Sequence, residues 1–163
     1  MLHNAIDEKL EDVSARLISL FNSFNDEQVN KRPAEGGWTP GQIMDHVLKF
    51  ISGVVQALQA NGSVNSRPID AYAKNIEDAF MNFEVKYDAP DFVVPAEPPH
   101  DKAKLLNKAD RVFGELKKLV AEVDLSLVYD NFSLPGMPPM TRYEWCVFAV
   151  THVERHVRQM QRA

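Results

Sequence analysis

The sequence predicts an all-α fold, a four-helix bundle with a long irregular connection between its second and third helices. In four long stretches the apolar residues recur at intervals of three and four, which is the period of an amphipathic helix. No stretch alternates apolar and polar residues over a convincing strand length, although FVVP and EVKY are apolar enough to resemble strands. The 163 residues, 45% hydrophobic and 25% charged, have the size and composition of one globular domain spanning residues 1–163.

The first helix is predicted over about residues 4–24, where one apolar stripe runs from Ile6 to Phe24. The third is predicted over about residues 101–123, where the same spacing runs from Leu105 to Val120. Each of these helices has an apolar face that must be buried, so each is expected to pack against the other helices of the bundle.

The second and fourth helices begin at the same kind of start signal. In WTPGQI, Thr39 is placed to cap the helix, Pro40 to occupy its first position and Gln42 to bond back to the cap. In MTRYEW, Thr141 and Glu144 repeat the reciprocal arrangement. These two capping boxes fix where each helix begins, and therefore how far along it every later residue lies.

Residues 61–100 form the long connection between the second and third helices. Four prolines from Pro90 to Pro99 exclude regular helix in their neighbourhood. A short helix is predicted over about residues 70–81. The rest is expected to be extended chain that lies across the bundle.

Charge and hydropathy exclude two classes of partner. The net charge is −5 and the lysines and arginines are scattered, so we expect no binding of nucleic acid. The first residues lack the basic and apolar regions of a secretory signal, and the longest apolar run, CVFAV, is too short to cross a bilayer. We therefore expect a cytoplasmic protein that does not contact membranes. The single cysteine, Cys146, lies in that run and is interpreted as a buried apolar residue, not a nucleophile.

Three histidines fall inside the predicted second and fourth helices. His46 lies about two turns into its helix, and His152 and His156 lie about three and four turns into theirs. Two histidines four residues apart present their nitrogens on one helical face, and a histidine from a facing helix completes a metal site that keeps open positions. HVERH is not a zinc-protease motif, because Glu154 projects to the far side of the helix. Spacing alone leaves the alternative open that these are hydrogen-bonded histidines of an ordinary bundle.

Five other residues are predicted to lie near the histidines. Gln42 and Gln159 are placed along the same helical faces, where they could orient ligands or hydrogen-bond to the imidazoles. Trp145 and Phe148 could form the wall of a pocket, or could be plain core. Arg155 flanks the same face and could attract a carboxylate, or could be a solvated charge at the end of the bundle.

Two motifs resemble those of a known family. GGWTPGQIMDHV, followed about a hundred residues later by THVERHVRQM, is similar to the first histidine segment and the terminal HxxxH segment of the DinB/YfiT-like superfamily. The resemblance spans nearly the whole chain. It implies a four-helix bundle with long connections and a divalent metal bound by His46, His152 and His156. Nothing in the sequence departs from this three-histidine pattern.

The resemblance also implies a class of chemistry. Members of the superfamily include S-transferases and isomerases that use bacillithiol, mycothiol or related thiols, besides many proteins described as metal-dependent hydrolases. We therefore expect one divalent transition metal, nickel or zinc before iron or manganese, and a low-molecular-weight thiol as cosubstrate for attack on a small electrophile. A hydrolase that uses metal-bound hydroxide, and a bundle that binds metal without catalysis, remain the alternatives.

A second apolar strip on the fourth helix predicts a further contact. Cys146, Val147, Val150 and Val157 lie opposite the histidine face, and a bundle helix with one buried stripe does not need them. Either residues 61–100 cover this strip, with FVVP lying over it, or the same strip of a second subunit does. The sequence favours a homodimer, because the first and third helices also carry apolar residues beyond one stripe.

Overall fold

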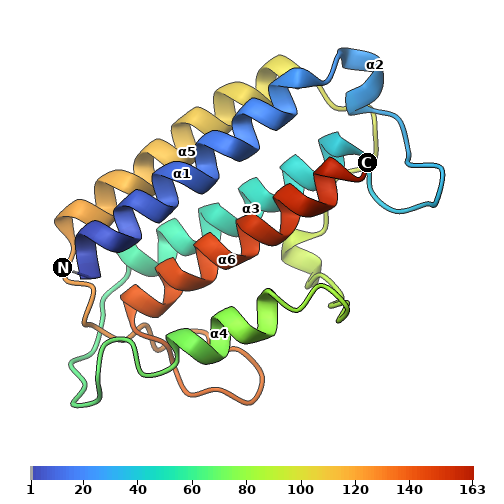
Figure 1. Cartoon of the computed structure of the whole chain (residues 1–163). Coiled ribbons are helices and arrows are strands. Elements are labelled where there is room, and N and C mark those ends of the chain that lie inside the picture. The colour runs from blue at the N-terminus through green and yellow to red at the C-terminus, as the bar shows by residue number, and fades with distance from the viewer. Residues whose placement is uncertain (1) are drawn as a thin grey trace.

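A computed structural model describes residues 2–163 and shows an all-α fold, as predicted (Figure 1). Among these residues no β-strand forms, and extended chain pairs only where Val128 bridges to Ser63 and to Thr141. Within the same range, no helix combines the length and the hydropathy that spanning a membrane requires. The elements are α1 (Leu2–Ser23), α2 (Asp26–Val29), α3 (Pro40–Gln59), α4 (Ala73–Phe80), a 3-10 turn η1 (Asp91–Val93), α5 (Lys102–Glu122) and α6 (Arg142–Gln161).

The four long helices, α1, α3, α5 and α6, pack together. Helix α3 contacts α5 and α6, and α1 contacts the same two helices. In Figure 1, α1 runs beside α5, and α3 runs beside α6. Their inward residues form one apolar core, in which Phe21, Ile43 and Phe113 are among the largest fully buried side chains. Burying such a side chain contributes about 1.5–3 kcal/mol, so these faces hold α3 and α6 firmly against each other.

The capping boxes predicted for α3 and α6 are confirmed. Thr39 Oγ1 accepts a hydrogen bond from Gln42 N at 3.0 Å, and Gln42 Oε1 accepts one from Thr39 N at 3.1 Å. Thr141 and Glu144 make the equivalent pair at 3.1 and 2.9 Å. Because the two helices begin where the sequence predicts, the histidines lie at the predicted depth along them.

The connection between α3 and α5 contains more structure than its sequence pattern indicates. The short helix expected at about residues 70–81 forms as α4, whereas η1 was not among the predicted elements. Helix α4 contacts α6 and η1 contacts α3, so the connection reaches both helices that carry the histidines. The one-turn helix α2, with a capping box between Asn25 and Gln28, was likewise not among the predicted elements.

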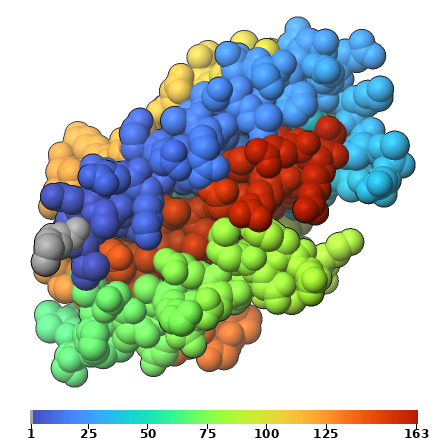
Figure 2. Space-filling model, viewed as in Figure 1, coloured from blue at the N-terminus to red at the C-terminus, as the bar shows by residue number. Residues whose placement is uncertain are grey.

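The second apolar strip of α6 is buried inside the single chain. Cys146, Val147 and Val157 are each no more than 3% exposed, and Val150 is partly buried. Helix α6 contacts α1, α3 and α4, and in Figures 1 and 2 it lies between α1 and α4. Because a helix with neighbours on several sides needs more than one apolar face, the strip does not require a second subunit. The homodimer stays a prediction, which light scattering would test.

Candidate metal centre

The packing of α3 on α6 brings the three histidines together. His46 Nε2 lies 3.1 Å from His152 Nε2, and His156 Nε2 also lies 3.1 Å from His152 Nε2. Each of the three residues offers one nitrogen, and these nitrogens all lie within 4.8 Å of one another. The three imidazoles therefore converge on one point between the two helices.

Two of the three rings are held by hydrogen bonds from their outward nitrogens. His46 Nδ1 donates to the carbonyl oxygen of Val93 at 2.8 Å, and His156 Nδ1 donates to Gln159 Oε1 at 2.7 Å. A neutral imidazole that carries its hydrogen on Nδ1 has a free lone pair on Nε2. Both Nε2 atoms therefore present acceptors toward His152. His152 Nδ1 is buried and has no hydrogen-bond partner among the described residues.

The convergence of the nitrogens fits a bound cation. If His152 Nε2 carried a hydrogen, it could donate to only one of the two facing lone pairs, whereas a cation would satisfy all three nitrogens together. Imidazole nitrogens bind zinc at about 2.0–2.1 Å, so two that share an ion lie within about 4.2 Å of each other. The two separations of 3.1 Å meet this requirement. Three imidazoles suit zinc, nickel, copper and iron.

The environment keeps the imidazoles neutral. Burial lowers the pKa of His46, and it lowers that of His152 well below its usual value, aided by repulsion from the other two histidines and Arg155. Burial and repulsion from His46 lower the pKa of His156 to about 3. Neutral imidazole is the form that binds metals, so the site is ready for a cation at neutral pH without losing protons.

Aromatic side chains surround the cluster. The ring of Phe148 stacks on His152 with centroids 5.5 Å apart and an interplanar angle of 19°. Measured between ring centroids, Phe50 lies 4.2 Å and Phe80 lies 6.1 Å from the same imidazole, and Trp38 lies 4.9 Å from the imidazole of His46. His152 itself is partly exposed, whereas His46 and His156 are buried. The rings lower the local dielectric beside the cluster, which strengthens charge interactions inside the site.

Comparison with known proteins assigns the family. The model of the DinB superfamily matches residues 9–160, which include all three histidines. The chain belongs to the DinB superfamily. It is also similar to YuaE of Bacillus subtilis strain 168, a protein described as uncharacterized, with 26% identity over 147 residues that cover 85% of this chain and 84% of YuaE. No solved structure gives a significant match.

The other predicted residues of this DinB-superfamily site take different places. Gln159 hydrogen-bonds to His156, and Phe148 packs on His152. Trp145 packs against Phe148, with ring centroids 5.9 Å apart, on the side of Phe148 away from the histidines. Its Nε1 is buried without a hydrogen-bond partner among the described residues. The Gln42 side chain is used in the cap of α3, and the hydrogen bonds of residues 2–163 include none from Gln42 to a histidine. A role for Gln42 beside the histidines stays a prediction.

Arg155 is bound to backbone carbonyls of the connection, and a role in attracting a carboxylate stays a prediction. Its guanidinium donates to the carbonyl oxygens of Phe80 and Asn82, at 3.3 and 2.9 Å, and to that of Val85. It also lies over the ring of Tyr87, 5.3 Å from the centroid. Arg155 thus ties the chain that follows α4 to the helix that carries two of the histidines. Cys146 is 1% exposed, and burial raises its pKa to about 12, which agrees with the buried apolar interpretation.

Sequence reasoning missed four residues of the site. Phe50 follows His46 by four residues, so helical spacing could have placed it on the same face. Trp38 precedes the cap of α3 and gave no comparable signal. Phe80 and the Val93 carbonyl come from the connection, and a backbone carbonyl has no signature in the sequence.

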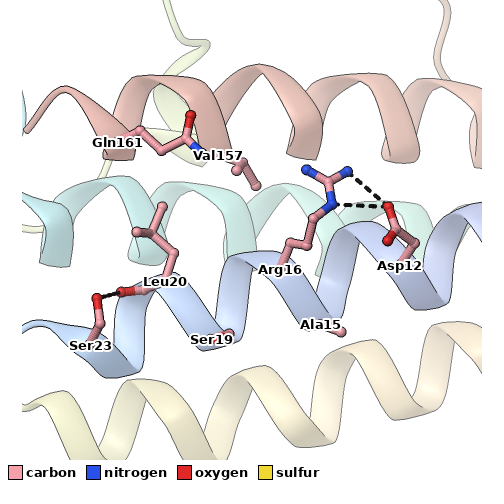
Figure 3. Close-up of a pocket in the computed structure, with 8 residues that line it drawn as sticks. All are labelled: Asp12, Ala15, Arg16, Ser19, Leu20, Ser23, Val157 and Gln161. Carbon is pink, nitrogen blue, oxygen red and sulfur yellow. Dashed lines mark hydrogen bonds and ion pairs between the residues drawn. The ribbon is translucent and has the colours of Figure 1, made fainter.

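A groove between α1 and α6 lies apart from the histidines (Figure 3). It encloses about 540 Å³, and its lining residues are Asp12, Ala15, Arg16, Ser19, Leu20, Ser23, Val157 and Gln161. Arg16 bonds to Asp12 at 2.9 Å and also pairs with Glu154 of α6. Glu154 therefore faces α1, as its predicted position on the far side of the helix requires.

The lowered pKa of His156 predicts how the stability of the metal-free protein depends on pH. Its pKa falls from an ordinary value of 6.5 to about 3 on folding, so between these values the unfolded chain binds a proton that the folded chain does not. Above about pH 6.5 the imidazole is neutral in both states and its titration does not affect stability. As the pH falls toward 3, protonation favours the unfolded chain and the folded state loses stability. Thermal melts of chelator-treated protein from about pH 7.5 to 5.5 should show a falling melting temperature. His156→Gln should reduce this slope, and an unchanged slope in the variant would contradict the assignment.

Proposed function

We propose that this protein is a metal-dependent transferase, in which one divalent transition metal held by His46, His152 and His156 activates a low-molecular-weight thiol for attack on a small electrophile. The observation that carries the proposal is the convergence of three neutral imidazole nitrogens, two pairs of them 3.1 Å apart, in an aromatic surrounding. Nickel and zinc are the ions proposed first, with iron and manganese as further candidates.

The ligand set supports this chemistry. Three neutral imidazoles leave the full positive charge on a bound cation, which can stabilise a thiolate or lower the pKa of water. The Val93 carbonyl and Gln159 orient two of the rings, and Phe50, Phe80 and Phe148 pack around the third, His152, which is partly exposed. The aromatic surrounding also favours an electrophile with an apolar part.

The absence of a carboxylate from the cluster favours a thiol over water as the nucleophile. Within residues 2–163 the group of converging ligands consists of histidines alone, and Glu154 is paired with Arg16 on the other side of α6. A thiol has a pKa of about 8.5, whereas bulk water has one of about 15.7. When a cation stabilises the thiolate, a thiol can lose its proton to solvent at neutral pH without a general base. Hydrolysis would benefit from a general base that takes a proton from water.

An activity screen tests the proposal. Metal-loaded protein is incubated with bacillithiol, mycothiol or a simpler thiol and with 1-chloro-2,4-dinitrobenzene, in parallel with a thiol-free assay on p-nitrophenyl acetate. We expect conjugation that requires both thiol and metal and that falls to the uncatalysed rate in His152→Ala. His3→Ala, which changes an exposed histidine of α1, is the matched control and should retain full activity.

Two outcomes would replace the proposal with one of its alternatives. Thiol-independent ester hydrolysis that disappears in His152→Ala, without any conjugation, would identify a hydrolase. Stoichiometric metal without either activity, across a broad set of thiols and electrophiles, would favour a bundle that binds metal without catalysis.

A further inference from the structure

Three side chains on two neighbouring turns of α3, those of Asp45, His46 and Lys49, hold one short segment of the connection, residues 93–96. His46 Nδ1 donates to the Val93 carbonyl at 2.8 Å, and Lys49 Nζ donates to the Val94 carbonyl at 2.9 Å. Asp45 Oδ2 accepts from the backbone N–H of Ala96 at 2.8 Å. The acceptor that orients His46 is therefore part of a segment that is itself held in place by the residues beside His46.

Asp45 contacts both the segment and a second anchor, Lys49. Its Oδ2 also lies 3.1 Å from Lys49 Nζ, so one carboxylate oxygen accepts from the Ala96 N–H and from the lysine that holds Val94. Asp45 is 8% exposed, and a charge-assisted bond in such a place is about twice as strong as a neutral one. Removing the carboxylate would leave the Ala96 N–H without its acceptor and free Lys49 to turn to solvent.

The two held histidines differ in where their acceptors come from. His156 donates to Gln159, three residues further along the same helix. His46 donates to a carbonyl 47 residues away, which reaches it only when residues 93–96 lie on α3. A neutral imidazole can carry its hydrogen on either nitrogen, and the partner decides which. The tautomer of His46 thus depends on the docking of residues 93–96, whereas that of His156 does not.

We propose that Asp45 is a positioning residue for the metal centre, which fixes His46 as a ligand by holding residues 93–96 on α3. The inference rests on the proposed metal site and deepens it. By keeping the Val93 carbonyl against His46 Nδ1, Asp45 leaves Nε2 free to bind the cation. Partners of this kind beyond the ligands typically change metal affinity by about 10–100-fold when they are removed.

The loss of Asp45 should act locally, because other contacts hold the connection on both sides of residues 93–96. Asn30 bonds to the backbone of His100 in both directions, at 2.6 and 3.0 Å. Arg155 ties residues 80–85 to α6. Asp45→Ala is therefore expected to keep the bundle folded, and Asp45→Asn, which retains an oxygen that can accept from Ala96 N–H, gives a second and milder variant.

The experiment compares wild type, Asp45→Ala and Asp45→Asn in two measurements. Nitrogen-15 NMR of metal-free protein with labelled histidines reports which nitrogen of His46 carries the hydrogen. Titration with cobalt(II), followed by its visible absorption, reports affinity and ligand geometry. We expect an Nδ1–H tautomer in wild type and a mixture in Asp45→Ala, with cobalt affinity lower by about 10–100-fold and an altered spectrum. Asp45→Asn should lie between them.

Asp101→Ala is the matched control. Asp101 also accepts a backbone N–H, that of Lys104 at 3.0 Å, but it caps α5, and within residues 2–163 it makes no hydrogen bond or ion pair with residues 93–96. Asp101→Ala should lower the melting temperature without changing the His46 tautomer or the cobalt affinity. An Asp45→Ala variant with the wild-type tautomer and an affinity within about threefold of wild type would overturn the inference. If wild type binds no cobalt, the metal site itself is wrong, and the NMR measurement still decides whether Asp45 fixes the tautomer of His46.

Discussion

Purified protein is expected to carry close to one transition-metal ion per chain, and a His46/His152/His156→Ala variant only traces. The reason is that three imidazoles on two packed helices form a site that exists before the ion arrives, so little ordering opposes binding. Elemental analysis of protein made without a histidine tag measures the content directly. Chelator-treated protein should recover the ion on titration, with a rise in melting temperature that grows with metal concentration.

The control for this experiment is His3→Ala, which removes an exposed histidine and should leave the metal content at its wild-type value. Each single alanine variant of the three ligands should also lose most of the metal, because two imidazoles leave the ion with fewer fixed bonds. Equal trace metal in wild type and in the triple variant, after both are offered nickel and zinc, would show that no such site exists.

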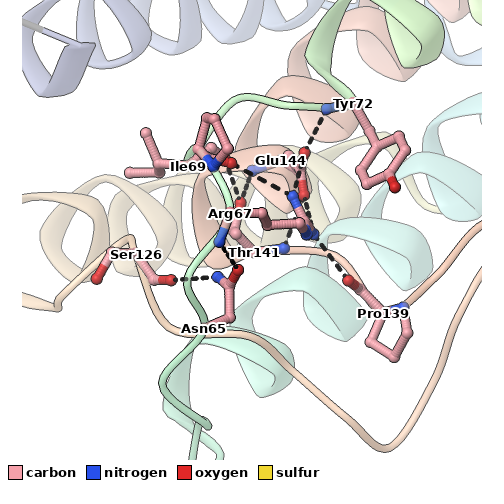
Figure 4. Close-up of polar contacts among 9 residues, drawn as sticks. Asn65, Arg67, Ile69, Tyr72, Ser126, Pro139, Thr141 and Glu144 are labelled. Atoms are coloured by element: carbon pink, nitrogen blue, oxygen red, sulfur yellow. Dashed lines mark hydrogen bonds and ion pairs between the residues drawn. The ribbon is translucent and has the colours of Figure 1, made fainter.

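Glu144→Ala is expected to destabilise the protein by about 3–5 kcal/mol, since it leaves buried partners of a charge unpaired. Glu144 is fully buried, and its two carboxylate oxygens accept from the Arg67 guanidinium at 2.7 and 3.0 Å (Figure 4). They also accept from the backbone N–H groups of Tyr72 and Thr141 at 2.6 and 2.9 Å. The substitution thus removes the acceptor for Thr141 N–H, which is one half of the capping box of α6, and the acceptor at the start of α4 together. The other half, from Glu144 N–H to Thr141 Oγ1, stays. Urea denaturation measures the loss in free energy of unfolding.

Two other variants separate the causes. Glu144→Gln keeps oxygen and nitrogen atoms in place but removes the charge opposite Arg67, so it should cost less than the alanine variant. Glu115→Ala removes an exposed carboxylate that accepts only from Gln59, and it should cost less than about 0.5 kcal/mol. If Glu144→Ala lowered the free energy of unfolding by less than about 1 kcal/mol, the buried network would contribute little beyond an ordinary helix cap.

The parts of the site that were predictable are those set by local chemistry. The reciprocal bonds of Thr39 with Gln42 fix the start of α3, and counting along the helix from there places His46. Helical period then puts His152 and His156 on one face, and the family motif pairs them with His46. None of this requires knowledge of how the connection runs.

The parts that were not predictable depend on contacts between distant segments. The Glu144 side chain was predicted as a cap, which it is, but its bond to Arg67 joins residues 77 positions apart. The Val93 carbonyl has no side chain to mark it, and prolines around it remove the helical period that would have located it. The sequence left open whether residues 61–100 or a second subunit covers the second strip of α6, because helical period does not tell how many neighbours α6 has within the chain.

The distance along the chain between His46 and the carbonyl that orients it has a consequence for how superfamily members can differ. The carbonyl lies 47 positions after His46, and the chain between them forms a loop that closes when residues 93–96 dock on α3. The entropy lost on closing such a loop grows only with the logarithm of its length, so doubling the loop costs about 0.6 kcal/mol. Insertions beside the exposed Asp88, which lies between the Arg155 contacts and residues 93–96, would therefore leave the histidine oriented at little thermodynamic expense. The connection can change in length and surface between relatives while the three ligands keep their geometry.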